Sequence, residues 1–199
     1  MDDVVASQAE APAAGAGGGE SRESVDLRWR LRAATDAAHR RLDAGFAAHD
    51  LTQRADYGAF LTAMYRAFAP LETWLDGVDP EGLPPDWAER RRADALRADL
   101  SGLGLAVPDG PGAVALPRGG APGLLYVLEG SRLGGQVLVR QVLASPDPMV
   151  CGNARFLRHG EGLRLWPSFV AWLAARPMSE SEAAIQGALA AFAVFEAVA

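Results

Sequence analysis

The sequence has no lysine and a single cysteine, Cys151, which limits how the protein can bind anions and form disulfides. Because arginine supplies nearly all the basic side chains, any anionic ligand must be bound mainly by guanidinium groups. One cysteine excludes an internal disulfide and is typical of proteins in a reducing compartment. The formal net charge of −6 argues against a nucleic-acid-binding protein, which needs a basic surface.

Long apolar runs are also missing. Nowhere does the chain offer the roughly 20 uncharged apolar residues of a membrane-spanning helix, so we expect no membrane association. Residues 1–25 are rich in Ala, Gly, Glu and Ser and lack a basic start followed by an apolar core, which predicts a disordered tail and no secretory signal. The remaining residues, 26–199, are predicted to form one cytoplasmic domain, with the 49% hydrophobic content usual for a globular protein.

Helical periodicity dominates this region, and no strand pattern is convincing, so the predicted fold is an all-α, single-domain bundle of about seven helices. The first helix should run from Leu27 to Ala47, and the second should begin near Asp56 and bend at Pro70. Residues 104–122 hold four prolines and five glycines, which predicts a long irregular connection. Further helices are expected over 86–100, 123–140, 153–158 and 166–175, and from Ser179 onward.

Two local features of these helices carry expectations of their own. Arg90, Arg91 and Arg92 lie in the helix predicted over 86–100, and we expect them on a solvated face beside acidic neighbours. Ser179 stands three residues before Glu182, the spacing of a capping box at the start of the last helix.

Residues 123–140, GLLYVLEGSRLGGQVLVR, read as a buried helix with glycines in its interior. Each internal glycine makes helix formation less favourable by about 1 kcal/mol relative to alanine. Gly130, Gly134 and Gly135 together therefore destabilise this helix by about 3 kcal/mol. At 100° per residue these glycines, with Gly123 and Ser131, are expected on one side of the helix. Such a strip with few side chains suits either close packing against another helix or the approach of a flat, bulky ligand.

The first helix carries polar residues that could serve such a ligand. Arg32, Thr35, His39 and Asp43 follow one another at spacings of three, four and four, which predicts one polar stripe. Asp43 could accept the Nδ1 proton of His39 and leave Nε2 as a metal ligand. Arg32 could bind a carboxylate with its fork of donors. Together these groups suit an acidic, flat, metal-bearing ligand, and haem has those properties.

Two segments of the sequence resemble those of a known family. LRAATDAAHRRLD at 31–43 and LYVLEGSRLGGQ at 125–136 resemble the two signatures of the biliverdin-producing haem oxygenases, most closely the bacterial branch associated with bacteriophytochromes. DLTQRADYGAFLTAMYRAF, ARFLRHG and WPSF are similar to that branch too, so the likeness covers nearly everything after residue 26. The resemblance implies a haem-oxygenase-like domain over 26–199. It also implies cleavage of haem at a meso carbon to biliverdin, carbon monoxide and ferrous iron, with dioxygen and electrons from a reductase or ferredoxin.

The resemblance also suggests roles for individual residues. His39 matches the ligand of the haem iron, and Arg32 falls where a basic residue contacts a propionate. Asp43 takes the place of the acidic residue that supports the histidine, and Thr35 belongs to the same haem-binding stretch.

On the other haem face, Gly130, Gly134 and Gly135 match distal-helix glycines that leave room for dioxygen. Ser131 stands where animal enzymes carry a carboxylate that organises water, and a hydroxyl is a weaker anchor. Arg132 or a residue before Gly123 could substitute for it. The second propionate lacks an obvious partner, for which Arg158 and Arg164 are candidates.

Other interpretations remain open at this point. A haem-binding carrier or sensor without enzymatic activity would use the same iron ligand, and the serine in place of a carboxylate motivates it. A helical bundle that binds only a protein partner is a second alternative. A thiamin-degrading enzyme on a similar scaffold would need Cys151 as nucleophile, but no candidate base lies near it in the sequence.

Overall fold

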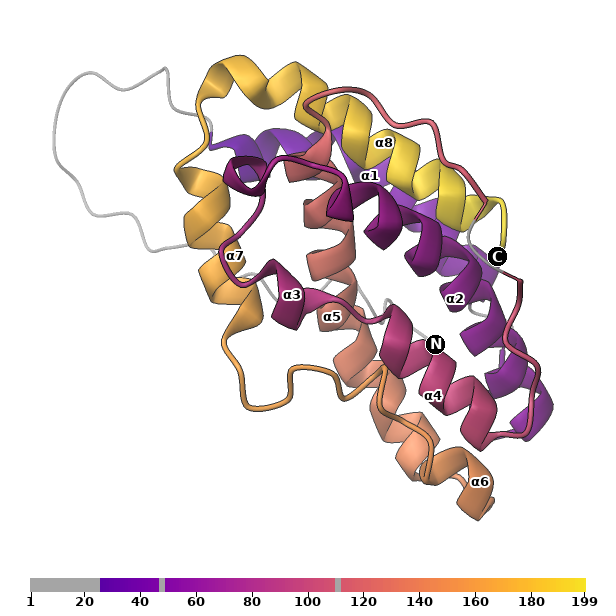
Figure 1. Cartoon of the computed structure of the whole chain (residues 1–199). Coiled ribbons are helices and arrows are strands. Elements are labelled where there is room, and N and C mark those ends of the chain that lie inside the picture. The colour runs from indigo at the N-terminus through magenta and orange to yellow at the C-terminus, as the bar shows by residue number, and fades with distance from the viewer. Residues whose placement is uncertain (1–25, 47–48, 110–111) are drawn as a thin grey trace, which may run out of the picture.

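The computed structural model describes residues 26–46, 49–109 and 112–199, and all the regular secondary structure within these ranges is helical (Figure 1). The tail predicted for residues 1–25 lies outside these ranges. The all-α prediction is confirmed. The helices are α1 (Leu27–Phe46), α2 (Arg54–Asp76), η1 (Pro80–Gly82), α3 (Trp87–Arg90), α4 (Ala93–Gly102), α5 (Ala121–Leu143), α6 (Pro148–Cys151), α7 (Leu165–Ala174), η2 (Met178–Glu180) and α8 (Ser181–Glu196).

Both α1 and α5 pack mainly against α8 and contact each other over only a short stretch. Glycine permits the close approach of α5 to α8. A Cβ atom on Gly123 would lie 1.6 Å from the carbonyl oxygen of Ala184, and one on Gly187 would lie 2.1 Å from that of Gly120. The first turn of the glycine-rich helix is therefore a helix-packing surface, as one of the two interpretations of its glycines required.

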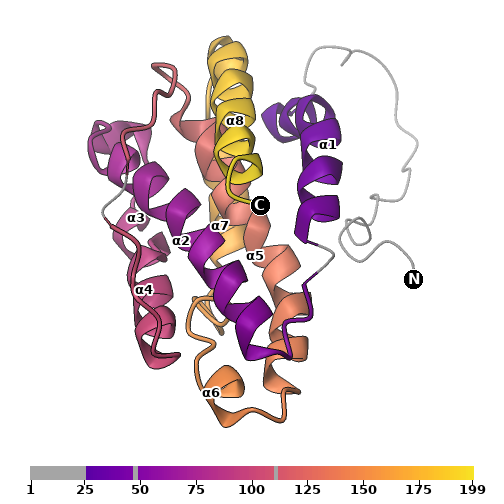
Figure 2. The same ribbon diagram turned by 90° about the vertical axis from the view of Figure 1, so that its right-hand side faces the viewer.

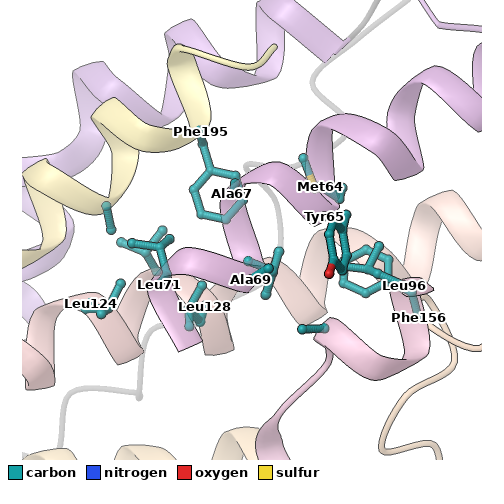
Figure 3. Close-up of a cluster of buried hydrophobic side chains, with 14 of the residues drawn as sticks. Met64, Tyr65, Ala67, Ala69, Leu71, Leu96, Leu124, Leu128, Phe156 and Phe195 are labelled. Carbon is teal, nitrogen blue, oxygen red and sulfur yellow. The ribbon is translucent and has the colours of Figure 1, made fainter. Parts of the chain in front are cut away.

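The hydrophobic core lies between α2, α4, α5 and α8 (Figure 3). The second helix buries an apolar stripe whose members follow one another at spacings of three and four, Phe60, Met64, Phe68, Leu71 and Leu75. Phe68 holds the centre of this core, because its ring meets those of Phe156 and Phe195 edge-on, each at a centroid distance of 5.3 Å. α2 continues as one helix through Pro70.

The helix predicted over 86–100 is broken into α3 and α4, so that prediction was wrong. The break has a clear cause, since the Glu72 carboxylate of α2 accepts hydrogen bonds from the backbone N–H groups of Arg92 and Ala93 at 2.7 and 3.1 Å. This carboxylate caps α4 from outside its own segment. The expected solvated face was also wrong, because Arg90 and Arg92 are 2% and 3% exposed and only Arg91 is exposed.

Two further helix predictions need correction. Residues 153–158 form turns, and the short helix lies earlier, at α6, where Asp147 caps it by accepting from the Met149 N–H at 2.9 Å. The capping box is absent from α8, which begins at Ser181 with no side-chain hydrogen bond at its N-cap. Ser181 is engaged elsewhere, since its hydroxyl accepts from Arg30 at 2.7 Å. None of the described helices combines the length and apolar character needed to cross a membrane.

Candidate functional site

His39 lies on α1 with its ring orientation set by two contacts. Its Nδ1 is 3.0 Å from the Asp43 carboxylate one turn later, as the spacing predicted. Its ring also meets the ring of Phe192 on α8 edge-on, at a centroid distance of 6.0 Å. The His39 side chain remains 46% exposed. Because Asp43 occupies Nδ1, Nε2 is the nitrogen left for a ligand.

The rest of the predicted polar stripe is only partly as expected. Arg32 is exposed, and its guanidinium lies over the ring of Trp29, 5.5 Å from the centroid. Thr35, however, is 3% exposed and donates its hydroxyl to the Leu31 carbonyl at 2.8 Å. Its placement on the polar stripe was therefore wrong. Thr35 is a packing residue of α1, because its one hydroxyl proton is already used within the helix.

The glycines of α5 face different surroundings, which corrects the single strip expected from the sequence. A Cβ atom on Gly130 would meet nothing within 4 Å, so its backbone borders open space. One on Gly135 would lie 3.7 Å from the Leu157 side chain, an ordinary packing contact, and Gly135 is buried. Gly134 is half-buried. Gly130 is thus the glycine whose missing side chain leaves uncovered backbone.

The two helices meet where Arg28 and Arg32 of α1 approach Tyr126 of α5. Burial raises the pKa of Tyr126, and the two nearby guanidinium charges oppose that rise. Trp166 of α7 completes this corner, with its ring centroid 6.3 Å from that of Tyr126 and 5.7 Å from the Arg28 guanidinium carbon. From here His39 lies about 10 Å further along α1, and Gly130 about 6 Å along α5.

Beyond this corner the two helices separate. Figure 1 shows α1 behind α8 and the upper part of α5, and Figure 2, turned by 90°, shows α1 to one side of α5, while α8 packs against both. On α5 a side chain at Gly130 would meet open space, and on α1 the imidazole of His39 is half exposed. The arrangement suits a flat ligand with one edge at the Arg32 corner. Of the other predicted propionate partners, Arg158 pairs with Glu161 at 2.8 Å and Arg164 is exposed just before α7.

Ser131 follows Gly130 and is held by Arg92, a residue that sequence reasoning missed. Arg92 Nη2 donates to the Ser131 hydroxyl at 2.9 Å and also to the Leu128 carbonyl. Ser131 in turn donates to the Leu128 carbonyl at 2.7 Å. The Arg92 guanidinium carbon lies 4.4 Å from the centroid of Phe68, and burial lowers its pKa to about 9. Arg92 stays charged at neutral pH and fixes the turn of α5 before Gly130.

Glu129 anchors a second buried network beside this turn. Its carboxylate accepts from Arg90 at 2.7 Å and from Arg132 at 3.0 Å, and the Glu129 and Arg90 side chains are each 1% exposed. Arg132 further donates to the Arg90 carbonyl at 2.7 Å and contacts His159 Nδ1 at 3.2 Å. Burial and the Arg132 charge lower the pKa of His159 to about 4. The side chain of Arg132 is therefore engaged by Glu129, Arg90 and His159, whereas Arg92 is the arginine that donates to Ser131.

One sequence signal could have revealed these networks. Glu129 interrupts an apolar stretch that includes Leu125 and Leu128, so the helical pattern places a carboxylate inside the protein. A buried carboxylate requires a cationic or hydrogen-bonding partner. The Arg90–Arg92 run was the available source of such partners.

The fold and site define a class of protein, an all-helical bundle with a half-exposed imidazole on one helix, α1, and uncovered glycine backbone on another, α5. Two relatives identify the family of this chain. The chain is 36% identical over 171 residues to the haem oxygenase PigA of Pseudomonas aeruginosa, covering 82% of this chain and 86% of that protein. It is 33% identical over 141 residues to a haem oxygenase of Xanthomonas campestris pv. campestris, covering 70% and 86%.

The fold is similar to that of the NO- and CO-bound haem oxygenase from Neisseria meningitidis, with a TM-score of 0.72 at 24% identity over 88% of this chain and 90% of that one. No family model matches the sequence. The chain belongs to the haem oxygenase family, and it is an enzyme of that family.

Proposed function

We propose that residues 26–199 form a catalytic domain that binds haem between α1 and α5 and cleaves it at a meso carbon. The products are biliverdin, carbon monoxide and ferrous iron, and the reaction uses dioxygen and electrons from an external reductase or ferredoxin. The observation that carries this proposal is the uncovered backbone at Gly130, on the helix next to the one that bears His39. Family membership and the residue chemistry of both helices support it.

His39 is proposed as the ligand of the haem iron through Nε2. The Asp43 contact at Nδ1 supports this role, because it fixes the tautomer and leaves Nε2 as the nitrogen that can bind a metal. Phe192 supports it as well, since its ring limits rotation of the imidazole from the α8 side. These two contacts hold the half-exposed imidazole in one orientation before a ligand binds.

The haem carboxylates are proposed to lie at the corner between α1 and α5. Arg32 is exposed there and supplies a planar fork of donors suited to a carboxylate. Arg28 adds a second guanidinium, and the Tyr126 hydroxyl lies close enough to both arginines for their charges to act on it. Two cationic side chains and a phenol suit an acidic edge of a flat ligand.

The distal side is proposed to act through space and hydrogen bonding, with the haem itself supplying the redox chemistry. Gly130 leaves room above its backbone for a small ligand. The Ser131 hydroxyl accepts from Arg92 and donates to Leu128, and one lone pair of its oxygen remains for a water molecule. Such a water can deliver a proton. Gly134 is proposed to border the same space, one turn after Gly130, while Gly135 supports α5 against Leu157.

The proposed partners follow from the resemblance in the sequence. A bacteriophytochrome is the proposed acceptor of the biliverdin product, and the cytoplasm is the proposed location. The single cysteine and the acidic composition support a cytoplasmic location without nucleic-acid binding.

An absorption time course separates this function from its rival, a haem carrier or sensor. The rival is favoured by Ser131, which lacks the charge of a carboxylate. The experiment mixes the protein with one equivalent of haem, then adds ascorbate or ferredoxin with its reductase in air. Loss of the Soret band with growth of biliverdin absorption is the expected result. A Soret band that persists indicates the carrier, and the absence of any Soret band contradicts haem binding altogether.

A further inference from the structure

A cavity lies away from the proposed haem site, where the C-terminal end of α2, the start of α5 and the η2 turn come together. Its volume is about 680 Å³, within the range of roughly 300–1,000 Å³ typical of small-molecule sites. No residue of α1 lines it. The α5 residues that do, Ala121 and Pro122, precede Gly130 by about 12 Å of helix. This cavity is therefore separate from the space beside His39.

The walls of this cavity combine an apolar surface with cationic groups. Trp74, Val78, Ala121 and Pro122 supply apolar surface. The ionisable residues in the lining are Arg118, Arg176 and Glu180, which gives one net positive charge. Among the ion pairs of the described residues, none joins Glu180 to either arginine. The two guanidinium groups can thus meet a ligand.

One side-chain nitrogen of Arg176 lacks a hydrogen-bond partner within the described ranges. Its Nε is buried and has no hydrogen-bond partner among the described residues. The side chain is held from two directions, because Nη1 donates to the Glu81 carbonyl at 3.2 Å and the guanidinium carbon lies 4.8 Å from the Trp172 ring centroid. A buried donor without a partner is rare and costs about 1–3 kcal/mol. Arg176 also lines the cavity, and the guanidinium has donors left for an anion there.

The start of α5 adds positive potential to the same cavity. α5 has no side-chain hydrogen bond at its N-cap, Gly120, and no acidic residue in its first turn. The positive end of this 23-residue helix is therefore not neutralised by its own side chains. Ala121, its first residue, lines the cavity.

We propose that this cavity binds an organic monoanion of the carboxylate class with an apolar body. The carboxylate would pair with Arg176 and Arg118, and the body would lie against Trp74 and Val78. Glu180 offsets one of the two arginines, and the remaining single positive charge of the lining is balanced by one carboxylate, whereas a phosphate monoester would leave the cavity with excess negative charge.

Calorimetric titration with 2-naphthoate tests this proposal, and its neutral isostere 2-naphthamide is the matched ligand control. Titrations use the protein both before and after saturation with haem. We expect one 2-naphthoate to bind per chain with equal affinity in both states, and 2-naphthamide to bind at least about tenfold more weakly. Loss of naphthoate binding on haem saturation would assign the probe to the haem site and overturn the proposal. Absence of binding by 2-naphthoate would do so too.

Three variants locate the binding. Arg176→Gln removes the charge and should weaken 2-naphthoate binding about tenfold or more. Thr73→Trp keeps both arginines and fills the cavity from the exposed side of α2, so it should abolish binding even if Arg176→Gln proves unstable. Arg140→Gln removes an exposed charge at the far end of α5 and should change nothing. Equal affinity in Arg176→Gln and Arg140→Gln contradicts the proposed site.

Discussion

The guanidinium of Arg92 donates a hydrogen bond of 2.9 Å to the hydroxyl of Ser131, and so joins the start of α4 to the middle of α5. The same nitrogen donates to the Leu128 carbonyl, so both acceptors lie on the turn of α5 around Gly130. Arg92 is buried beside Phe68, which prevents water from replacing it. The position of the uncovered backbone in the proposed haem site therefore depends on a residue outside α5.

Replacing Arg92 with Met tests this dependence. Met keeps apolar contact with Phe68 but removes the donors to α5, so the turn at Gly130 loses its anchor. We expect haem binding to persist and biliverdin formation in single-turnover absorption experiments to slow about tenfold or more. The free energy of unfolding should fall by about 2 kcal/mol, because two acceptors on α5 lose a donor.

Ser131→Ala is the matched control for this effect. It removes the acceptor and leaves Arg92 on the Leu128 carbonyl, so it should slow turnover less than Arg92→Met does. In a double-mutant cycle we expect a coupling free energy of about 1 kcal/mol between the two residues. Wild-type turnover in Arg92→Met would show that the anchor has no role in the reaction.

His39→Ala tests the proposed iron ligand. The variant should keep its helical circular dichroism, because the ring is half exposed, and lose the absorption spectrum of the histidine-ligated haem complex. Added imidazole should restore that spectrum by occupying the vacated space. His49→Ala and His159→Ala are the controls and should keep it. An unchanged spectrum in His39→Ala, with loss in His159→Ala, would reassign the ligand.

Gly130→Leu and Gly123→Ala form a pair that separates the two uses of glycine on α5. A side chain at Gly130 enters open space, so Leu there should raise the free energy of unfolding by up to about 1 kcal/mol and weaken haem binding. At Gly123 even a methyl group would overlap the Ala184 backbone. Gly123→Ala should lower the free energy of unfolding by about 2 kcal/mol or more. Thermal unfolding and haem titration of both variants measure these effects, and destabilisation by Gly130→Leu would indicate helix packing there.

The sequence predicts features that depend on local spacing and misses those that depend on distant partners. The His39–Asp43 contact follows from a four-residue spacing, and the apolar stripe of α2 follows from its period. The break before α4 could not be predicted, because its cap, Glu72, belongs to another helix. Spacing also placed Gly123, Gly130 and Gly135 together, but Gly123 faces the Ala184 backbone, Gly135 faces the Leu157 side chain and Gly130 faces open space. Only the tertiary arrangement distinguishes packing glycines from an uncovered one.

Glu129→Gln tests the buried network that holds α5 to α3. The change is nearly isosteric but removes the buried charge that Arg90 and Arg132 share, so Arg90 keeps only Asp86, at 2.6 Å, and Arg132 loses its paired carboxylate. We expect the free energy of unfolding to fall by about 3–5 kcal/mol in urea denaturation. Asp94→Asn removes the exposed partner of Arg97 and serves as the control, with an expected loss below about 0.5 kcal/mol. Equal effects in the two variants would contradict the role of burial.

His159 makes the stability of the protein depend on pH in a defined direction. Its pKa is about 4 in the folded protein, against an ordinary value of 6.5, because of burial and the neighbouring Arg132 charge. Above pH 6.5 both the folded and unfolded states are neutral at this residue, so it contributes no pH dependence. Between about pH 6.5 and pH 4 the unfolded state binds a proton that the folded state does not, and stability therefore falls as the pH falls.

Urea denaturation at pH 7.5 and pH 5.0 measures this contribution when the wild type is compared with His159→Asn. Asn can still accept a hydrogen bond from Arg132 but does not titrate, so the comparison isolates the imidazole from the carboxylates that also change over this range. We expect the wild type to lose about 2 kcal/mol more than the variant between the two pH values. An equal loss in both proteins would mean that His159 titrates normally when folded, and a smaller loss in the wild type would mean that the folded state favours the charged imidazole.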